Sequence, residues 1–252
     1  MRDPSILERT FIHCPGIGAS SESRIWRAGI HNWADFLTNE KRHISDRMLN
    51  KAAPVLQESA KRLAQEDHEW FAAILPAREH WRAWEAFGEH PAFLDIETTG
   101  GMSPDDLTVV GMFDGKNMHQ FIKGRNLHEF PAAIADKTIL ITFFGTGFDL
   151  PFLRRAYNIE LNHMHIDLCF LLKRLGYSGG LKKIEHELGI NRTEQTDGLS
   201  GMDAVRLWYE WRRGKTTSLQ TLLTYNREDV INMRTLLEFA YPLIVQKTLY
   251  GA

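Results

Sequence analysis

The sequence has little cysteine, little net charge and no cysteine pair spaced for metal binding. Its 252 residues include two cysteines, Cys14 and Cys169, and no CxxC. This pattern argues against a disulfide scaffold and against a cysteine-rich zinc site, and it is typical of a reducing cytosol. The formal net charge is −2. No overall positive field therefore attracts nucleic acid, and any phosphate binding must come from local groups or bound cations.

Long hydrophobic runs are also missing. No stretch approaches the ~20 apolar residues that a transmembrane helix needs, and the first residues, MRDPSILERT, lack the apolar segment of a signal peptide. We therefore expect a cytoplasmic protein that makes no membrane contact. The sequence contains no repeats, and its 43% hydrophobic content is enough for a substantial core.

The stretch from Ala92 to Gly101, AFLDIETTGG, places two acidic residues in an apolar strand. Side chains alternate along a strand, so Asp95 and Glu97 point to the same face. Two neighbouring carboxylates repel, and burying them is costly unless a cation lies between them. Hard oxygen ligands suit Mg²⁺ or Mn²⁺. The alternative is an edge strand whose polar face meets water.

Two later segments supply further polar groups. In ILITFFGTGFDLPFL (139–153), Asp149 stands at the entrance of a helix, where an acidic residue also serves as an ordinary cap. In TLLTYNREDVINMRTLL (221–237), Tyr225 and Asp229 are four residues apart and share one helix face. A buried tyrosine hydroxyl bonded to its neighbours is the alternative interpretation of that pair.

In chain order these residues read D-x-E, F-D-x-P-F and Y-x-x-x-D. The order resembles the DEDD superfamily of 3′→5′ exonucleases, in the subgroup with tyrosine in its last motif. The resemblance is closer to the YprB-type ribonuclease-H-like exonuclease family, and it covers nearly the whole chain. It rests on the segments HIDLCFLLKRLGYSGGLKKIEHELGI (165–190), GMDAVRLWYEW (201–211), YNREDVINMRTLLEFAY (225–241), CPGIG (14–18) and LPAREHWRAWEAF (75–87). One departure is Phe144, where the family commonly has asparagine.

The resemblance implies a metal-dependent 3′→5′ exonuclease that acts on nucleic acid with a free 3′ end, DNA being slightly favoured over RNA. It implies two ions, Mg²⁺ or Mn²⁺, held by Asp95, Glu97, Asp149 and Asp229. It also implies that Tyr225 orients the attacking water. The alternative is a nucleic-acid-binding or scaffolding module with a catalytically weak nuclease fold, and endonuclease activity is a third reading. No protein partner is predicted.

The sequence predicts two regions. Residues 1–88 are expected to be a small all-α region, and residues 91–252 a ribonuclease-H-like nuclease domain of the α/β class. In the first region, helices over Ser5–Thr10 and Ser20–Ala28 would flank His13–Gly18 as a helix-hairpin-helix. The backbone N–H groups at Gly16 and Gly18 would then hold a phosphate; an ordinary turn in a helical bundle is the alternative. Further helices are expected over the ranges Asn32–Leu37 and Ile44–Leu75.

Within the second helical range, Pro54 is expected to kink the chain or to begin a new helix. The aromatic stripe of Trp81, Trp84 and Phe87 is interpreted as core. The second region is expected to form a mixed five-stranded sheet flanked by helices. Its predicted strands are Ala92–Thr98, Leu107–Asp114, Asn117–Lys123, Thr138–Phe144 and His163–Asp167. The predicted helices are Leu127–Ala135, 149–157, 168–175, 181–188, 201–212 and 218–240.

Two other groups deserve a prediction. His163, His165 and Asp167 alternate along one strand and would suit zinc, but no further histidine completes the set, so we expect Asp167 to cap the next helix instead. Lys182 and Lys183 lie on the polar side of an amphipathic helix. We interpret them as a solvated face, with contact to a substrate phosphate as the alternative.

Overall fold

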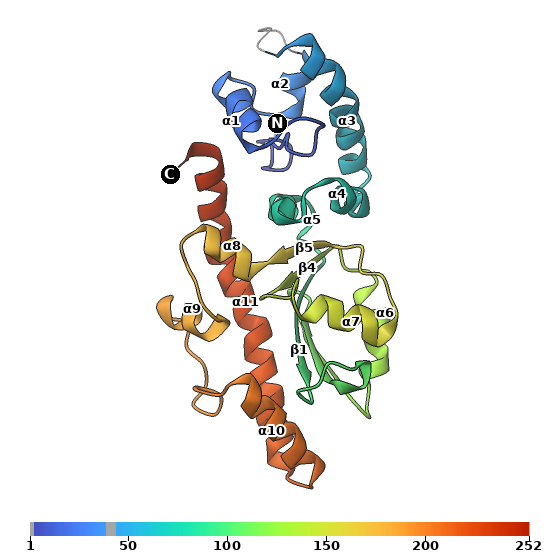
Figure 1. Cartoon of the computed structure of the whole chain (residues 1–252), viewed down its shortest axis with the longest axis vertical. Coiled ribbons are helices and arrows are strands. Elements are labelled where there is room, and N and C mark those ends of the chain that lie inside the picture. The colour runs from blue at the N-terminus through green and yellow to red at the C-terminus, as the bar shows by residue number, and fades with distance from the viewer. Residues whose placement is uncertain (1–2, 39–43, 252) are drawn as a thin grey trace.

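The computed structural model describes residues 3–38 and 44–251 of the chain. The remaining residues of the two predicted regions, 1–2, 39–43 and 252, lie outside this description. A helical N-terminal part sits at one end of a β-sheet, and helices cover both faces of that sheet (Figure 1). The expected arrangement of a small α-helical region followed by an α/β region is therefore present.

The sheet has five strands in the order β3-β2-β1-β4-β5. β1 is central and pairs antiparallel with β2 and parallel with β4, while β3 and β5 extend the two sides. This confirms the predicted mixed sheet, although β4 and β5 are shorter than expected. The strands are β1 (Pro91–Thr98), β2 (Leu107–Phe113), β3 (Met118–Ile122), β4 (Ile139–Thr142) and β5 (Met164–Asp167).

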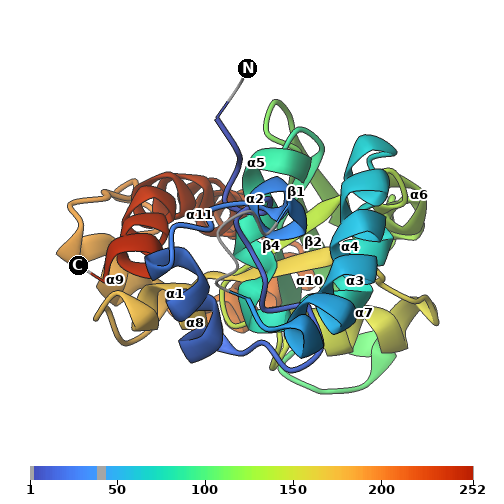
Figure 2. The same ribbon diagram turned by 90° about the horizontal axis from the view of Figure 1, so that it is seen from above.

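The two faces of β1 have different chemistry because its side chains alternate. Leu94 and Ile96 belong to a buried cluster that also contains Phe130 and Phe152, on the side of the sheet covered by α6 (Phe130–Ile134) and α7 (Asp149–Tyr157). Phe93 belongs to another cluster with residues of the long helix α11 (Thr216–Tyr250). The two sets of helices lie on opposite sides of the sheet (Figure 2).

The remaining helices of the second region are short. They are η2 (Pro104–Asp106), η3 (Leu127–Glu129), α8 (Leu168–Arg174), α9 (Leu181–Glu187) and α10 (Gly201–Arg212). The last helix, α11, is longer than predicted, because it continues past Pro242 to Tyr250. One side of this extension is buried: Ile244 lies in the core, and the ring of Tyr241 packs against that of Trp81 at 6.2 Å.

The N-terminal part is helical, as expected, with two corrections. Ser5–Thr10 forms turns rather than a helix, and Phe11 and Ile12 donate their N–H groups to the carboxylate of Glu22 instead of continuing a helical ladder. Pro54 does not begin a new helix, because it lies inside one helix that ends at Ala64; the kink expected there stays a prediction. The helices are α1 (Ala19–Arg27), α2 (Trp33–Thr38), α3 (Asp46–Ala64), α4 (His68–Ile74), η1 (Ala77–Ala83) and α5 (Trp84–Phe87).

One hydrophobic core joins the two parts. A single cluster of buried residues runs from Leu7 through Trp81 to the strand residue Ile141, so the interpretation of the aromatic stripe as core is confirmed for Trp81 and Phe87. The backbone N–H of His165 on β5 donates to Nδ1 of His80 at 3.0 Å. The boundary between 88 and 91 therefore stays a prediction. In the described part of the chain no helix has the length and hydrophobicity to cross a membrane.

Candidate active site

Three carboxylates converge where the central strand meets the long helix. Asp95 and Glu97 come from β1 and Asp229 comes from α11, and a carboxylate oxygen of each lies within 4.8 Å of the others. The period-two prediction for the strand pair is therefore confirmed. Glu97 and Asp229 are buried, and Asp95 is half-buried. The Oε1 atom of Glu97 is buried without a hydrogen-bond partner. Buried acceptors normally have a partner, so this oxygen is suited to bind a cation.

Asp149 lies beside this cluster at the start of α7. Its Oδ1 accepts the backbone N–H of Ile96 at 3.1 Å, so it is anchored to the strand residue between Asp95 and Glu97. The capping alternative is wrong, since Phe148 occupies the N-cap position and no side chain caps the helix. Asp149 stands outside the group of three that lies within 4.8 Å.

Burial and mutual repulsion make the charged forms of these carboxylates unfavourable unless cations are bound. Burial, reinforced by the charge of Asp229, raises the pKa values of Asp95 and Glu97 well above their usual range. Burial also raises the pKa of Asp149 to about 7. Divalent ions would relieve both the desolvation and the mutual repulsion, and all four groups offer the hard oxygen ligands that Mg²⁺ and Mn²⁺ prefer. The donor set therefore fits such ions.

Tyr225 faces the cluster from α11, one helical turn before Asp229. Its hydroxyl accepts a hydrogen bond from Nζ of Lys182, which also lies 4.1 Å from the centre of the tyrosine ring. Burial raises the pKa of Tyr225, so the phenol stays protonated. The interpretation of Lys182 as a solvated residue is wrong: it is half-buried and reaches the site. Lys183 is exposed, as expected, and donates to the carbonyl of Ser178.

Arg192 is a site residue that the sequence analysis missed. Its side chain is only 4% exposed; it pairs with both oxygens of Glu185 at 2.7 and 2.8 Å and with Asp229 at 2.5 Å. Burial raises the pKa of Asp229, although the positive charges of Arg192 and Lys182 partly offset this rise. The available signal was Glu185, an acidic residue on the apolar side of the 181–188 helix, which required a buried cation nearby.

A second missed residue is Asn226, which follows Tyr225 on α11. Its Nδ2 donates to Oδ2 of Asp95 at 2.9 Å, and its Oδ1 accepts from Gln120. Asn226 thereby fixes the orientation of the Asp95 carboxylate. Position 111 on the neighbouring strand β2 requires glycine, because a Cβ atom there would lie 2.2 Å from Oδ1 of Asn226.

The other candidate residues do not join the cluster. His163 hydrogen-bonds to the Ile134 carbonyl and His165 to Thr142. Asp167 caps α8 through the N–H of Cys169, as predicted. His163, His165 and Asp167 therefore do not form a zinc site, and among the residues that the structure describes the acidic group on β1 and α11 is the one whose ligand atoms lie close enough together to hold an ion.

Gly16 and Gly18 are exposed in the N-terminal part, before and at the N-cap of α1. They lie apart from the acidic cluster. Gly16 has φ +80°, a conformation that favours glycine. Because Ser5–Thr10 is not helical, only the second helix of the predicted helix-hairpin-helix is present. Phosphate binding at these glycines stays a prediction.

Comparisons with known proteins agree with this architecture. The structure is similar to that of a family B DNA polymerase from the hyperthermophilic archaeon Pyrobaculum calidifontis, with a TM-score of 0.53 and 15% sequence identity. The likeness covers 64% of this chain and 25% of the polymerase chain, so this chain spans about a quarter of that protein's length. At this identity the likeness concerns the fold.

No curated protein matches the sequence. A family model does match: it describes the RNase_H superfamily and covers residues 92–241, from the first half of β1 to Tyr241 in α11. The match includes every residue of the acidic cluster and confirms the ribonuclease-H-like fold. This chain belongs to the RNase_H superfamily.

Proposed function

We propose that the protein is a metal-dependent 3′→5′ exonuclease that hydrolyses the phosphodiester bonds of nucleic acid. The observation that carries the proposal is the buried cluster of Asp95, Glu97 and Asp229, in which one Glu97 oxygen has no partner. Such a cluster destabilises the folded chain unless it binds cations. The superfamily and the likeness to a DNA polymerase support a nucleic acid substrate. The YprB-type resemblance supports the 3′→5′ direction.

We place two Mg²⁺ or Mn²⁺ ions on Asp95, Glu97, Asp229 and Asp149. When bound, such ions lower the pKa of a water molecule and stabilise the charge that develops on the leaving oxygen. The protein's part is to hold the carboxylates in place. Asn226 orients Asp95, and the strand N–H of Ile96 orients Asp149. Both contacts fix the carboxylates before ions bind, so less conformational entropy is lost on binding.

Tyr225 has a defined role in this proposal. Lys182 already donates to its hydroxyl oxygen, and the raised pKa keeps the phenol protonated. The tyrosine proton is therefore available to donate toward the attacking water or toward a phosphate oxygen, and so to orient it. The Lys182 ammonium lies close enough to add positive charge beside the scissile phosphate.

The proposed substrate is a nucleic acid strand with a free 3′ end, DNA being slightly favoured over RNA. Gly16 and Gly18 are proposed as a separate phosphate contact, since both are exposed at the N-terminus of α1. Lys183 is proposed as a further contact from α9.

A binding or scaffolding module is the second candidate. Phe144 favours it, because the family commonly has asparagine at this position, and so does the lack of net positive charge. The acidic cluster argues against it, because a module that only binds phosphate gains nothing from four repelling carboxylates.

Incubation with 5′-labelled DNA and RNA, single- and double-stranded, tests the proposal. We expect a ladder of products shortened from the 3′ end in Mn²⁺, none in EDTA, and none from Asp229→Asn, which keeps the size of the side chain. A substrate whose 3′ end is blocked should stay intact. Activity that survives in EDTA or in Asp229→Asn would overturn the assignment. Binding without cleavage by the intact protein would favour the module.

A further inference from the structure

Two exposed phenylalanines lie together at the loop that precedes Asp149. The side chains of Phe144 and Phe170 are 50% and 46% exposed, and their ring centres lie 6.2 Å apart. Phe144 precedes Asp149 by one short loop, and Phe170 lies on α8. The large aromatic side chains of this fold are mostly buried, and exposing two of them together is unfavourable in the free protein.

The backbone at Phe144 is strained. Its φ is +65°, a region that bulky residues rarely adopt, and residues strained in this way cluster at functional sites. Asp167 maintains this conformation, because its carboxylate accepts the N–H groups of Phe144 and Thr146 at 2.9 and 3.0 Å. The same carboxylate caps α8, which carries Phe170. One side chain therefore fixes the position of both aromatic residues.

The Phe144 ring is held against its own loop. A Cβ added at Gly147 would lie 2.8 Å from an atom of this ring, so the glycine allows the ring to pack on the loop backbone. Such support restrains the ring. A restrained and exposed aromatic surface is suited to stacking against another planar group, since little conformational entropy is lost on contact.

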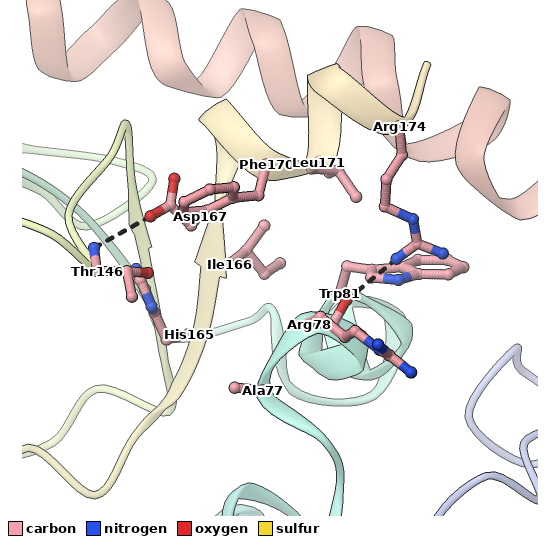
Figure 3. Close-up of a pocket in the computed structure, with 10 residues that line it drawn as sticks. All are labelled: Ala77, Arg78, Trp81, Thr146, His165, Ile166, Asp167, Phe170, Leu171 and Arg174. Atoms are coloured by element: carbon pink, nitrogen blue, oxygen red, sulfur yellow. Dashed lines mark hydrogen bonds between the residues drawn. The ribbon is translucent and has the colours of Figure 1, made fainter. Parts of the chain in front are cut away.

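A cavity of about 200 Å³ adjoins Phe170. Phe170, Asp167 and Thr146 lie on one side of it, and on the other side Arg174 lies over Trp81 (Figure 3). Drug-sized ligands occupy ~300–1,000 Å³, so this space suits a single ring system rather than a larger ligand. The side chain of Arg78 at the cavity wall is 74% exposed, although it also approaches Glu79 at 3.8 Å.

We propose that Phe144 and Phe170 form a stacking platform for a nucleobase of a single strand whose backbone enters the acidic cluster. The identity of this ligand rests on the proposed function. Phe144 lies on the loop that leads into Asp149, so we place the base it holds in a nucleotide close to the scissile phosphate. Stacking tolerates every base, so the platform adds affinity without sequence preference. Arg78 supplies a cation that a neighbouring phosphate can reach.

The test measures binding apart from cleavage. Short single-stranded oligonucleotides carrying 2-aminopurine at successive positions from the 3′ end are titrated with the intact chain in Ca²⁺, and fluorescence reports stacking. Phe144→Ala and Phe170→Ala should each weaken binding roughly 5- to 150-fold, the range measured for loss of one stacked base. Phe144→Trp should restore it. Tyr250→Ala is the matched control, because this exposed tyrosine lies about 30 Å along α11 from Asp229.

Two further measurements separate stacking from general damage to the fold. An abasic nucleotide at the position that quenches 2-aminopurine should bind the native protein and Phe144→Ala equally, because the partner of the ring is then missing. Phe144→Gly should relieve the backbone strain, so its melting temperature should equal or exceed that of the native protein while its affinity falls. A merely structural phenylalanine would not move stability and affinity in opposite directions.

The results also distinguish this inference from the proposed function. Unchanged affinity in the double variant Phe144→Ala/Phe170→Ala overturns the platform, and normal cleavage by that variant leaves the nuclease assignment standing. Base-dependent binding by a native protein that never hydrolyses its ligand in Mn²⁺ supports the platform and rejects the nuclease. If the native protein binds no oligonucleotide, the platform is rejected.

Discussion

Replacing Arg192 by methionine would probe the balance of charge in the site. The arginine is almost completely buried and is shared by two buried carboxylates, Glu185 and Asp229. Removing one partner of a buried ion pair typically costs about 3–5 kcal/mol, because the other partner keeps an uncompensated charge. Part of this cost is offset at Glu185, which also accepts from Asn232 at 2.9 Å. We therefore expect a loss near the lower end, about 3 kcal/mol, in EDTA.

Divalent ions should recover part of that loss. Without the arginine, Asp229 loses its ion-pair partner, and of the two positive charges that act on it only that of Lys182 still repels an ion. The stabilisation by Mn²⁺ should then be larger in Arg192→Met than in the native protein. An ion at 100 times its dissociation constant stabilises a fold by about 2.7 kcal/mol. Glu185 lies outside the acidic group of three, so its share of the loss should remain.

Urea denaturation in EDTA and in Mn²⁺ measures both effects. The double variant Glu185→Gln/Arg192→Met is the control, since it removes both charges of one pair and should be more stable than Arg192→Met alone. The reasoning is refuted if Arg192→Met loses less than about 1 kcal/mol in EDTA. It is also refuted if Mn²⁺ stabilises the native protein and the variant equally.

Three further outcomes are expected. Tyr225→Phe keeps the ring beside Lys182 but loses the hydroxyl, so turnover at saturating substrate should fall ~10²-fold or more with little change in melting temperature; a near-native rate would make the tyrosine structural. Arg82→Ala leaves Glu22 buried without its cation and should cost about 3–5 kcal/mol in urea denaturation, whereas a loss below 1 kcal/mol would contradict the importance of this pair. Burial lowers the pKa of His13 to about 4, and the unfolded chain binds this proton near pH 6.5. Stability should therefore fall by roughly 2 kcal/mol as the pH drops from 7.5 to 5, and His13→Gln should remove that part of the pH dependence.

The sheet and its acidic pair could be predicted because they depend on local geometry. Strand alternation alone puts Asp95 and Glu97 on one face, and helix periodicity puts Tyr225 and Asp229 on another. The chain order of these motifs then identified the fold. These statements require no knowledge of which helix packs on which strand.

The missed parts of the site depend on tertiary packing. The direction of Lys182 is set by how α9 lies against α11, and the burial of Arg192 depends on the same contact. Asp149 was placed correctly at the start of a helix, but its bond to Ile96 requires that β1 and β4 be neighbours. A local pattern cannot separate that role from a cap.

Helix ends were the other weakness. Pro54 was expected to kink the helix or to begin a new one, yet the helix ends only at Ala64, after which Glu66 takes φ +55° and Asp67 caps the next helix. Helix α11 runs past its predicted end at residue 240 and past Pro242, because the burial of Ile244 outweighs the backbone hydrogen bond that a proline cannot make.

Helix α11 also sets a length scale for any substrate. It carries Tyr225 and Asp229, and its last turn, with Lys247 and Tyr250, lines a cavity together with Trp26 and Arg27 of α1. From Asp229 to Tyr250 the helix measures about 30 Å, which corresponds to about nine nucleotides of a stacked strand. A strand that runs along α11 from the acidic cluster reaches α1 only beyond that length. If the glycines before α1 bind phosphate, only oligonucleotides longer than about nine nucleotides reach both them and the acidic cluster. Affinity should then rise in a single step as the oligonucleotide length passes that value.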